Sequence, residues 1–490
     1  MSTSTDPGQR RAADRAAFGH FIDGEEVASL SGATFASIDP YTRSPWAYVA
    51  LGDEADADKA VAAARRAFDE GPWPRMSTLE RRDILHRFAD LIEAHADELA
   101  TADTRDMGKP ITQSRGVDVP RTALNFRFFA DHAHGEMAES LPMGPRYHAY
   151  TTYEPAGVVV AIAPWNFPMM LESWKVAPAL AWGNTVVLKP AEDTPASATI
   201  LARLAAEAGI PAGVFNVVHG FGPDSVGSAL TEHPDVDRIT FTGESTTGSI
   251  IARAASAHLV PVSLELGGKG ANVVFADADL DNAVDWSIRA IFTNAGQVCL
   301  AGSRIYVQRS IRDEFERRFI AAAEAMRLGD PLDPETQVGP LASEIHYAKV
   351  RSYIDSVAES GGTVLTGGPV EDWFIRPMVI ADPRESSRHQ QEEIFGPVVT
   401  ISTFDTDEEA VARVNDSPFG LNAMIFTENL SRAHRVSQAL TVGTVWVNCF
   451  FIRDLRAPFG GAKHSGVGRE GGSFSREFFT EPRAIVMQLN

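Results

Sequence analysis

Cysteine is scarce in this 490-residue chain, which has only Cys299 and Cys449. Two cysteines cannot form a disulfide framework, and without a CxxC pair they do not form a cysteine-based zinc site. Long apolar runs are also missing: no stretch approaches the ~18 residues of a membrane span, and the N-terminal segment lacks the apolar core of a signal peptide. We therefore predict a protein of a reducing compartment, by default the cytoplasm, with neither a metal nor a membrane as a partner.

Basic residues are too few to balance the acidic ones, 44 against 65, so the net charge is −21. Such a chain is a poor candidate for binding nucleic acid or an anionic membrane surface. Hydrophobic residues make up 44% and charged residues 22%, which is typical of a folded globular protein rather than a disordered one. Because a single core rarely grows past roughly 250–300 residues, we predict two large domains.

The hydrophobic pattern changes along the chain. Apolar residues at three- and four-residue spacing predict helices over 55–69, 79–100 and about 117–135. From about residue 156 onward, short β-branched runs alternate with helical stretches, which predicts parallel sheets of the doubly wound α/β type. A second alternating unit fills roughly 266–460. Residues 1–17 are polar, and we expect them to be loose.

Two strand-like segments, 145–155 and 482–490, lie outside both alternating units. An isolated strand leaves an unpaired edge and needs a partner. We expect the two segments to pair with each other and to extend the sheet of a neighbouring subunit. The alternative is a local patch on the same subunit.

Three residues carry the candidate chemistry. Cys299 follows a glycine and a glutamine in FTNAGQVCL, although a lone cysteine is more often a small buried apolar residue than a nucleophile. Glu265 ends a β-like run before Gly-Gly, at the strand end where α/β sheets bind ligands, although a solvated loop glutamate would look the same. Asn166 stands between Pro164 and Pro168, which fix the backbone around its amide, although asparagine is common in turns.

Together the three side chains support one reaction. A thiolate attacks the carbon of an aldehyde, and an amide N–H stabilises the oxyanion that forms. Hydride transfer to a nicotinamide leaves a thioester. A carboxylate then activates the water that hydrolyses this thioester.

Seven motifs resemble, in order, those of the aldehyde dehydrogenase superfamily from about residue 20 to the C-terminus: PWNFP, KPAEDTP, FTGESTTG, LELGGK, FTNAGQVC, EEIFGPV and PFGGAKHSGVGREGG. The resemblance implies Cys299 as the nucleophile and Glu265 as the general base. It implies Asn166, with the backbone N–H of Cys299, as the oxyanion hole. Glu470 is either a second water-handling carboxylate or part of a structural salt bridge. Lys175 is expected near Glu265, to tune it or as a plain structural lysine.

The resemblance also implies the domain organisation. A Rossmann-like NAD-binding domain would cover 18–140 and 156–265, and a catalytic domain would cover 266–460. Segments 141–155 and 474–490 would form a small β arm for oligomerisation. The protein would then be a homodimer or a homotetramer.

On the cofactor side the resemblance implies NAD. Lys189 and Glu192 are expected to hold the adenosine ribose, where the carboxylate of Glu192 would repel the 2′-phosphate of NADP. The glycine-rich turn GFGPDSVG, which contains Gly222, departs from GxGxxG. Gly243 opens a strand-to-helix junction where helix N–H groups could face a pyrophosphate. Related enzymes commonly have serine at the next position, whereas this chain has Glu244, whose anionic side chain we expect to point away.

The nicotinamide end is implied by a different motif. Glu393 and Phe395 in EEIFGP are expected to hold the nicotinamide ribose and ring. Trp165 would line the same cleft. For each of these residues, packing in the core or a place on the surface is the alternative.

The substrate is indicated by Arg121 in PRTALNFRFFA and Arg453 in VNCFFIRDLRAPFGG. Both segments resemble the muconic semialdehyde dehydrogenases, including the 2-hydroxymuconate and 2-aminomuconate enzymes, which implies two guanidinium groups gripping a substrate carboxylate. The alternative is that Arg121, Arg127, Arg453 and Arg456 form surface ion pairs with Asp118, Asp131 and Asp454. Cys449 in the same wall is expected to be packing.

Three other functions stay open. A betaine-type or broad-range aliphatic aldehyde dehydrogenase would use aromatic walls, for which Phe450 and Phe451 are candidates, whereas Arg453 argues against a cationic substrate. A CoA-acylating enzyme commonly lacks the glutamate that stands here as Glu265. A non-catalytic structural protein on this fold need not keep the nucleophile, which is present as Cys299.

Overall fold

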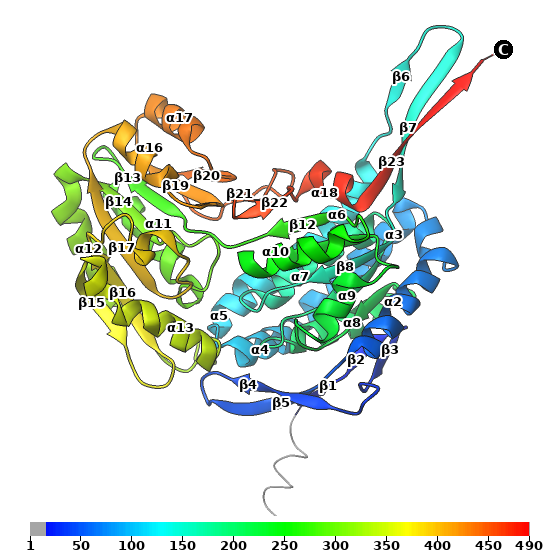
Figure 1. The fold of residues 1–490 in the computed structure, drawn as a ribbon, viewed down its shortest axis with the longest axis horizontal. Coiled ribbons are helices and arrows are strands. Elements are labelled where there is room, and N and C mark those ends of the chain that lie inside the picture. Colours follow the sequence, from blue (N-terminus) through cyan, green and yellow to red (C-terminus); the bar gives the residue numbers. More distant parts are fainter. Residues whose placement is uncertain (1–15, 490) are drawn as a thin grey trace, which may run out of the picture.

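The computed structural model describes residues 16–489, whose strands form two large sheets in different halves of the molecule (Figure 1). The first sheet has eight strands in the order β22 (Gly466–Val467), β12 (Val262–Glu265), β11 (Arg238–Thr242), β8 (Val158–Ile162), β9 (Thr185–Lys189), β10 (Phe215–Val217), β2 (His20–Ile22) and β3 (Glu25–Val27). The five strands from β12 to β10 are parallel, and β22 and β2 run antiparallel to their neighbours.

The chain order reverses inside this sheet. β8, β9 and β10 follow one another toward one side, whereas β11 and β12 lie on the other side of β8. Doubly wound sheets bind ligands outside the carboxyl ends of their strands at such a reversal. We therefore expect the ligand site at the carboxyl ends of β8, β9, β11 and β12.

Helices cover both faces of the first sheet. Val159 and Ala161 of β8 pack in one core cluster with α7 (Pro168–Ala181), and Val158 and Val160 pack in another with α2 (Glu54–Asp69). Because successive residues of a strand point to opposite faces, a strand covered on both sides must be apolar throughout. This explains the continuous run VVVAI, all five residues of which are buried.

The second sheet has seven strands in the order β15 (Thr363–Pro369), β16 (Ile375–Ala381), β17 (Val398–Phe404), β14 (Arg304–Gln308), β13 (Ala271–Val274), β19 (Asn422–Phe426) and β20 (Thr444–Val447). All neighbours are parallel except β15 and β16. Its longer helices are α11 (Leu280–Phe292), α12 (Arg312–Glu324), α13 (Glu344–Asp355), α16 (Asp407–Asn415) and α17 (Leu430–Ala439). The predicted doubly wound α/β fold is thus confirmed.

The other elements lie in both halves and in the connections between them. They are β1 (Ala16–Phe18), β4 (Thr34–Asp39), β5 (Ser44–Ala50), α5 (Ile111–Gln113), α8 (Ala196–Glu207), α9 (Val226–Glu232), α10 (Ser245–Ser256), α14 (Val357–Ser360), α15 (Arg388–Gln391), β18 (Phe419–Gly420), β21 (Ala462–Lys463) and α18 (Gly472–Phe479).

Two local predictions need correction. The helix predicted over 79–100 is two helices, α3 (Thr78–Ala94) and α4 (Ala96–Met107), because His95 leaves the helical conformation at φ −101°, ψ 25°. The prediction that residues 1–17 are loose is wrong at its end, since β1 pairs with β5. Residues 1–15 lie outside the described part of the chain. The third predicted helix is α6 (Val119–Gly135).

A narrow arm projects from the body (Figure 1). β7 (Tyr147–Pro155) pairs with β23 (Thr480–Gln488) over nine residues, and β6 (Ser140–Pro142) pairs with the other edge of β7. The predicted pairing between these distant segments is therefore present. The domain boundaries drawn from the sequence, including this arm as a separate unit, stay a prediction.

Candidate active site

The predicted residues of the first half gather at the carboxyl edge of the first sheet. The strand register pairs Ile162 with Lys189, Ile162 with Phe241, and Thr242 with Glu265. The ends of β9, β8, β11 and β12 therefore lie at one level, although they are far apart in the sequence. Asn166 follows β8 and Gly243 follows β11, so both belong to the same edge.

Asn166 is held through both its side chain and its backbone. Its Nδ2 donates a hydrogen bond to the carbonyl oxygen of Gln297 at 3.0 Å, and its own carbonyl accepts one from Asn294 Nδ2 at 2.9 Å. The side chain is buried, and Pro168 begins α7 two residues later. The amide is therefore fixed against the segment that carries Cys299.

Cys299 follows a turn with unusual backbone geometry. Asn294 and Ala295 both have φ of 52°, and Gly296 has φ of 72°. Residues other than glycine rarely adopt this left-handed region, so packing from outside must hold the turn. The Gln297 side chain supplies part of this hold, since its Nε2 donates to Asn294 and its Oε1 accepts from the Ala342 N–H, both at 3.0 Å.

Cys299 is partly buried. Burial, followed by the negative charges of Glu393 and Glu265, raises its pKa to about 12. The backbone of Cys299 also lies against Gly268, where a Cβ atom would collide with the carbonyl oxygen of Cys299. Gly268 thus allows the segment after Glu265 and the cysteine segment to meet, and Gly267 in the same way lies against the carboxylate of Glu393.

Glu265 is buried, and its Oε1 has no hydrogen-bond partner within residues 16–489. Burial, and then the negative charge of Glu470, raises the pKa of Glu265 well above its usual range, while Lys175, Arg453 and Arg469 oppose this shift. A buried carboxyl with a raised pKa and a free oxygen is a candidate for proton transfer.

Glu470 is tied into a buried network rather than left free. It accepts hydrogen bonds from Trp174 Nε1 at 2.5 Å, Lys175 Nζ at 3.2 Å, Ser263 Oγ at 3.2 Å and Thr240 Oγ1 at 3.3 Å. The structural salt bridge that was one of two predictions for Glu470 is present. Lys175 binds Glu470 directly and reaches Glu265 only through its electric field.

The two arginines predicted to bind the substrate differ in their surroundings. Arg453 is partly buried, and its guanidinium carbon lies 3.7 Å from the ring centre of Phe459 and 4.6 Å from that of Trp174. Its Nη2 is fully buried without a hydrogen-bond partner in the described chain. Burial, then the positive charge of Arg121, lowers the pKa of Arg453 to about 9. Arg121 donates to Asn125 Oδ1 at 3.2 Å on α6.

The alternative of surface ion pairs holds with a predicted acid for only one of the four arginines. Arg456 pairs with Asp454. Arg127 pairs instead with Asp90 and Glu93, because these acids of α3 face it across the contact between α3 and α6. Among residues 16–489, no carboxylate lies within ion-pair distance of Arg453 or Arg121. Asp118 pairs with Lys109 in the core, and Asp131 pairs with Arg82.

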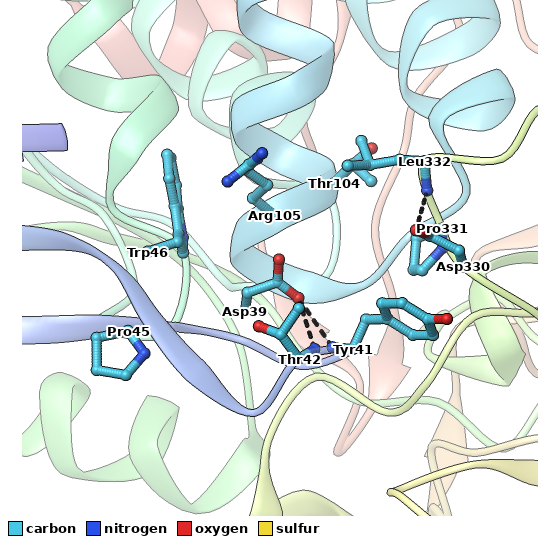
Figure 2. A pocket seen from close by; sticks show the side chains of 10 residues that line it. All are labelled: Asp39, Tyr41, Thr42, Pro45, Trp46, Thr104, Arg105, Asp330, Pro331 and Leu332. Atoms are coloured by element: carbon cyan, nitrogen blue, oxygen red, sulfur yellow. Dashed lines mark hydrogen bonds between the residues drawn. The ribbon is translucent and has the colours of Figure 1, made fainter. Parts of the chain in front are cut away.

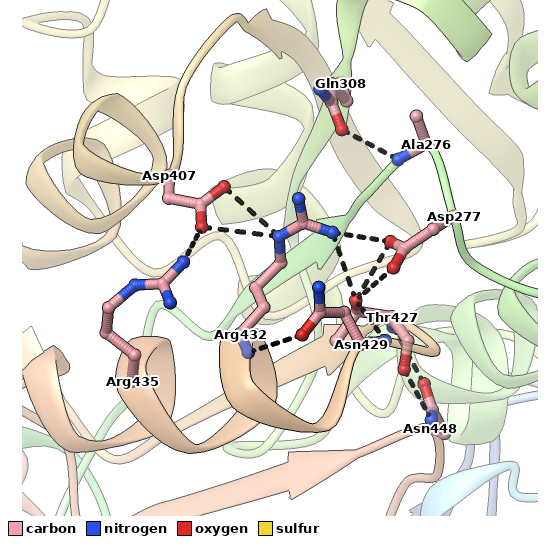
Figure 3. A network of polar contacts seen from close by, with 9 residues as sticks. All are labelled: Ala276, Asp277, Gln308, Asp407, Thr427, Asn429, Arg432, Arg435 and Asn448. Atoms are coloured by element: carbon pink, nitrogen blue, oxygen red, sulfur yellow. Dashed lines mark hydrogen bonds and ion pairs between the residues drawn. The ribbon is translucent and has the colours of Figure 1, made fainter.

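The loop that carries Arg453 begins at a polar network, which Figure 3 shows. Asn448 exchanges two hydrogen bonds with the backbone of Thr427, at 3.0 and 2.9 Å. The Thr427 hydroxyl donates to Asp277 at 2.9 Å, and Asp277 pairs with Arg432 at 2.8 Å. The first residue of the loop, Asn448, is therefore anchored to the segments that follow β13 and β19.

The predicted residues for adenosine ribose and pyrophosphate line the same edge of the first sheet. Lys189 Nζ lies 3.4 Å from Glu192 Oε2, and the Glu192 side chain is 41% exposed. A Cβ atom at Gly222 would meet no atom within 4 Å, so the space beside it is open. Glu244 is exposed at the N-terminus of α10 and makes no side-chain cap bond.

The predicted nicotinamide residues form one cluster with a residue that the sequence reasoning missed. Trp165 and Phe395 are in T-shaped contact at 5.3 Å, and His346 contacts Trp165 at 4.9 Å. Glu393 Oε1 accepts a hydrogen bond from Gly268 N at 2.8 Å, and burial raises the pKa of Glu393 to about 7. Asn294 and Gln297 were also missed, although both lie inside the recognised FTNAGQVC motif.

A separate surface pocket of about 360 Å³ shares no residue with this site (Figure 2). Its acidic groups are already engaged locally: Asp39 accepts from the Tyr41 and Thr42 N–H groups, and Asp330 accepts from the Leu332 N–H. In residues 16–489 no three metal-binding side chains converge, and no helix is long and apolar enough to cross a membrane.

The fold and the site define a class: a doubly wound α/β protein with a thiol, a buried carboxylate and a fixed asparagine at the switch edge of its first sheet. A family model described as the aldehyde dehydrogenase family matches residues 27–485. The chain belongs to the aldehyde dehydrogenase family.

Individual relatives agree on the family and differ in substrate. A 2-hydroxymuconic semialdehyde dehydrogenase of Pseudomonas sp. (strain CF600) is 49% identical, over 96% of this chain and 99% of the relative. A mitochondrial benzaldehyde dehydrogenase of Antirrhinum majus is 45% identical, over 96% and 88%. A crystal structure of an indole-3-acetaldehyde dehydrogenase complexed with NAD+ is 43% identical, with a TM-score of 0.95 over 98% and 99% of the two chains. The cytoplasmic location stays a prediction.

Proposed function

We propose that this NAD-dependent aldehyde dehydrogenase oxidises an aldehyde that also carries a carboxylate, of the muconic semialdehyde type, in the catabolism of aromatic compounds. One observation carries the proposal: a partly buried, unpaired guanidinium at Arg453, whose field reaches both Glu265 and Cys299. A buried cation without a counter-ion is costly unless a ligand supplies the negative charge. The 2-hydroxymuconic semialdehyde dehydrogenase of Pseudomonas supports the same substrate class.

In the proposed mechanism the Cys299 thiol gives its proton to solvent, and the Sγ thiolate attacks the aldehyde carbon. Asn166 Nδ2 and the Cys299 backbone N–H donate hydrogen bonds to the oxyanion. Bound NAD would supply the acceptor for the hydride of this carbon, which would leave a thioester on Cys299. Glu265 then removes a proton from water, whose oxygen attacks the thioester, and the acid and the Cys299 thiol are released.

The geometry supports these roles. The hydrogen bond from Asn166 Nδ2 to the Gln297 carbonyl occupies one of its two N–H groups, so the second is available to a ligand. The raised pKa of Glu265 makes it a stronger base once ionised, and its free Oε1 gives water a place to bind. The ion pair of Lys175 and Glu470 is proposed to place opposite charges beside Glu265, which lower and raise its pKa respectively.

The residues at the edge of the first sheet fit NAD. Lys189 and Glu192 would bind the adenosine ribose, with Glu192 disfavouring a 2′-phosphate, and Gly222 and Gly243 would lie along the pyrophosphate. Thr242 Oγ1, at the end of β11, is buried without a hydrogen-bond partner in the described chain, as expected of a group that meets a ligand. Trp165, Glu393 and Phe395 would bind the nicotinamide half.

The betaine-type alternative is less well supported. A cationic substrate would need free aromatic faces, whereas Arg453 already lies over Trp174 and Phe459. A CoA-acylating enzyme would not need the buried carboxyl of Glu265.

We also propose that the arm joins subunits into a homodimer or homotetramer. Leu141, Val486, Met487 and Leu489 expose 47%, 58%, 43% and 47% of their surface on or beside it. Apolar side chains on a strand edge favour pairing with another chain. Light scattering of Val486→Lys beside the parent protein tests this, since a smaller particle is expected and an unchanged mass would contradict it.

The test of function is NADH formation by purified protein with 2-hydroxymuconate semialdehyde, benzaldehyde and betaine aldehyde in turn, with and without CoA. We expect preference for the muconate compound and no need for CoA. Cys299→Ala should abolish turnover, whereas Cys449→Ala, which removes the other thiol, should not. Preference for betaine aldehyde would contradict the proposed substrate. Activity in Cys299→Ala would contradict the proposed mechanism.

A further inference from the structure

The loop Glu393–Gly396 is held in a strained conformation. Phe395 has φ of 62°, in the left-handed region that a bulky aromatic residue rarely adopts. Such a backbone persists only when surrounding contacts impose it. Trp165, Gly268 and Gly296 supply some of these contacts. Residues 342–350, which include the start of α13, supply others.

His346 makes the most direct of these contacts. Its Nε2 lies 2.7 Å from the carbonyl oxygen of Phe395, and its ring contacts both Trp165 and Phe395. A carbonyl only accepts, so Nε2 must carry the hydrogen. Burial lowers the pKa of His346 to about 4, so the ring is a neutral donor at ordinary pH.

The same stretch makes two further contacts. Val350 lies one turn after His346 on the same face of α13, and a Cβ atom at Gly396 would come within 2.8 Å of its Cγ1. The Ala342 N–H donates to Gln297 Oε1 at 3.0 Å. Residues 342–350 therefore touch both the loop of Phe395 and the turn before Cys299.

The two held segments also touch each other. A Cβ atom at Gly296, in the turn before Cys299, would collide with the carbonyl oxygen of Gly396. A displacement of the Phe395 loop would therefore be felt at the cysteine turn, because no space separates them.

We propose that His346 is a positioning residue: its hydrogen bond to the Phe395 carbonyl fixes Phe395 and Glu393 for the nicotinamide half of the cofactor, in register with Cys299. This inference rests on the proposed function of that loop. His346 itself need not touch cofactor or substrate.

The test compares His346→Leu, which removes the donor, with His346→Gln, whose amide nitrogen reaches about as far as the imidazole Nε2. The chain offers a matched control in His389, whose Nε2 lies 2.7 Å from the Tyr353 carbonyl and whose buried ring makes a T-shaped contact with Tyr353. NADH affinity is measured by fluorescence titration, steady-state kinetics with NAD varied, and thermal unfolding for each variant.

We expect His346→Leu to weaken NADH binding about tenfold, as for one lost hydrogen bond, and to raise KM for NAD while lowering kcat. His346→Gln should restore the NADH affinity and the kinetic constants toward those of the parent protein. His389→Leu should lower only the unfolding temperature. Equal NADH affinity in His346→Leu and the parent protein would overturn the inference. If His346→Leu fails to fold, His346→Asn, whose shorter amide cannot reach the carbonyl, replaces it. If the parent protein binds no NADH, the proposed function itself is wrong.

Discussion

Arg453→Met tests the carboxylate clamp directly. Methionine keeps a flexible apolar stem against Trp174 and Phe459 and removes the guanidinium. A hydrogen bond to a charged group contributes about 1.5–3 kcal/mol, and about 1.4 kcal/mol is a tenfold change, so kcat/KM for a carboxylate-bearing aldehyde should fall about 10- to 150-fold. Most of the loss should be a higher KM, because the clamp holds substrate and transition state alike.

The assay follows NADH absorbance at saturating NAD with the aldehyde varied, for 2-hydroxymuconate semialdehyde and for benzaldehyde, which has no carboxylate. Benzaldehyde kinetics should change no more than about twofold. Arg456→Met is the matched control, since Arg456 lies in the same loop but has a 74% exposed side chain paired with Asp454. An equal loss for both aldehydes, or the same loss in Arg456→Met, would refute the clamp.

Three further results are expected. Glu265→Gln should release about one NADH per active site and then turn over about 10²- to 10⁴-fold more slowly, because thioester hydrolysis loses its base; stopped-flow absorbance measures both phases. The pKa of Cys299 is raised to about 12, so the thiolate fraction grows tenfold per pH unit below it, and iodoacetamide should inactivate about a hundredfold faster at about pH 9 than at about pH 7. Lys109→Met should lower the free energy of unfolding in urea by about 3–5 kcal/mol, since it leaves the fully buried Asp118 without its cation.

Each result has a control. Slow NADH release from the first turnover of Glu265→Gln would place this residue before the thioester and contradict its role as hydrolytic base. Cys449→Ser should keep the pH dependence of inactivation. If this variant loses it, the reactive thiol is Cys449 rather than Cys299. Lys109→Met combined with Asp118→Leu should regain most of the stability, and no recovery would show that packing, rather than an unpaired charge, caused the loss.

Local sequence was sufficient for much of the architecture. VVVAI, TVVLK and RITFT became β8, β9 and β11, all of whose residues are buried, because these strands lie inside a sheet that is covered on both faces. The motifs around Cys299, Glu265 and Asn166 were readable because they and four others resemble, in order, those of the aldehyde dehydrogenase superfamily, whereas each residue alone had an ordinary alternative. The break at His95 was not readable, because the apolar spacing continues through it.

Arg453 and Arg456 show where sequence stopped being informative. They are three residues apart in one loop, yet one guanidinium lies over two aromatic rings and the other pairs with Asp454 at the surface. Similarly, Phe395 has a backbone conformation that favours glycine, and His346 of α13, 49 residues earlier in the chain, bonds its carbonyl. Both outcomes depend on contacts between segments that are distant in the chain.

The sequence by itself determined the class of the fold, the strand ends that carry the chemistry, and the family, because periodicity and short motifs act over a few residues. The tertiary structure decided the charge state and positioning of the site: the raised pKa values of Cys299 and Glu265, the unpaired Arg453, and the hold of His346 on Phe395. Burial and field effects sum over neighbours from many segments, and only the folded chain brings those neighbours together.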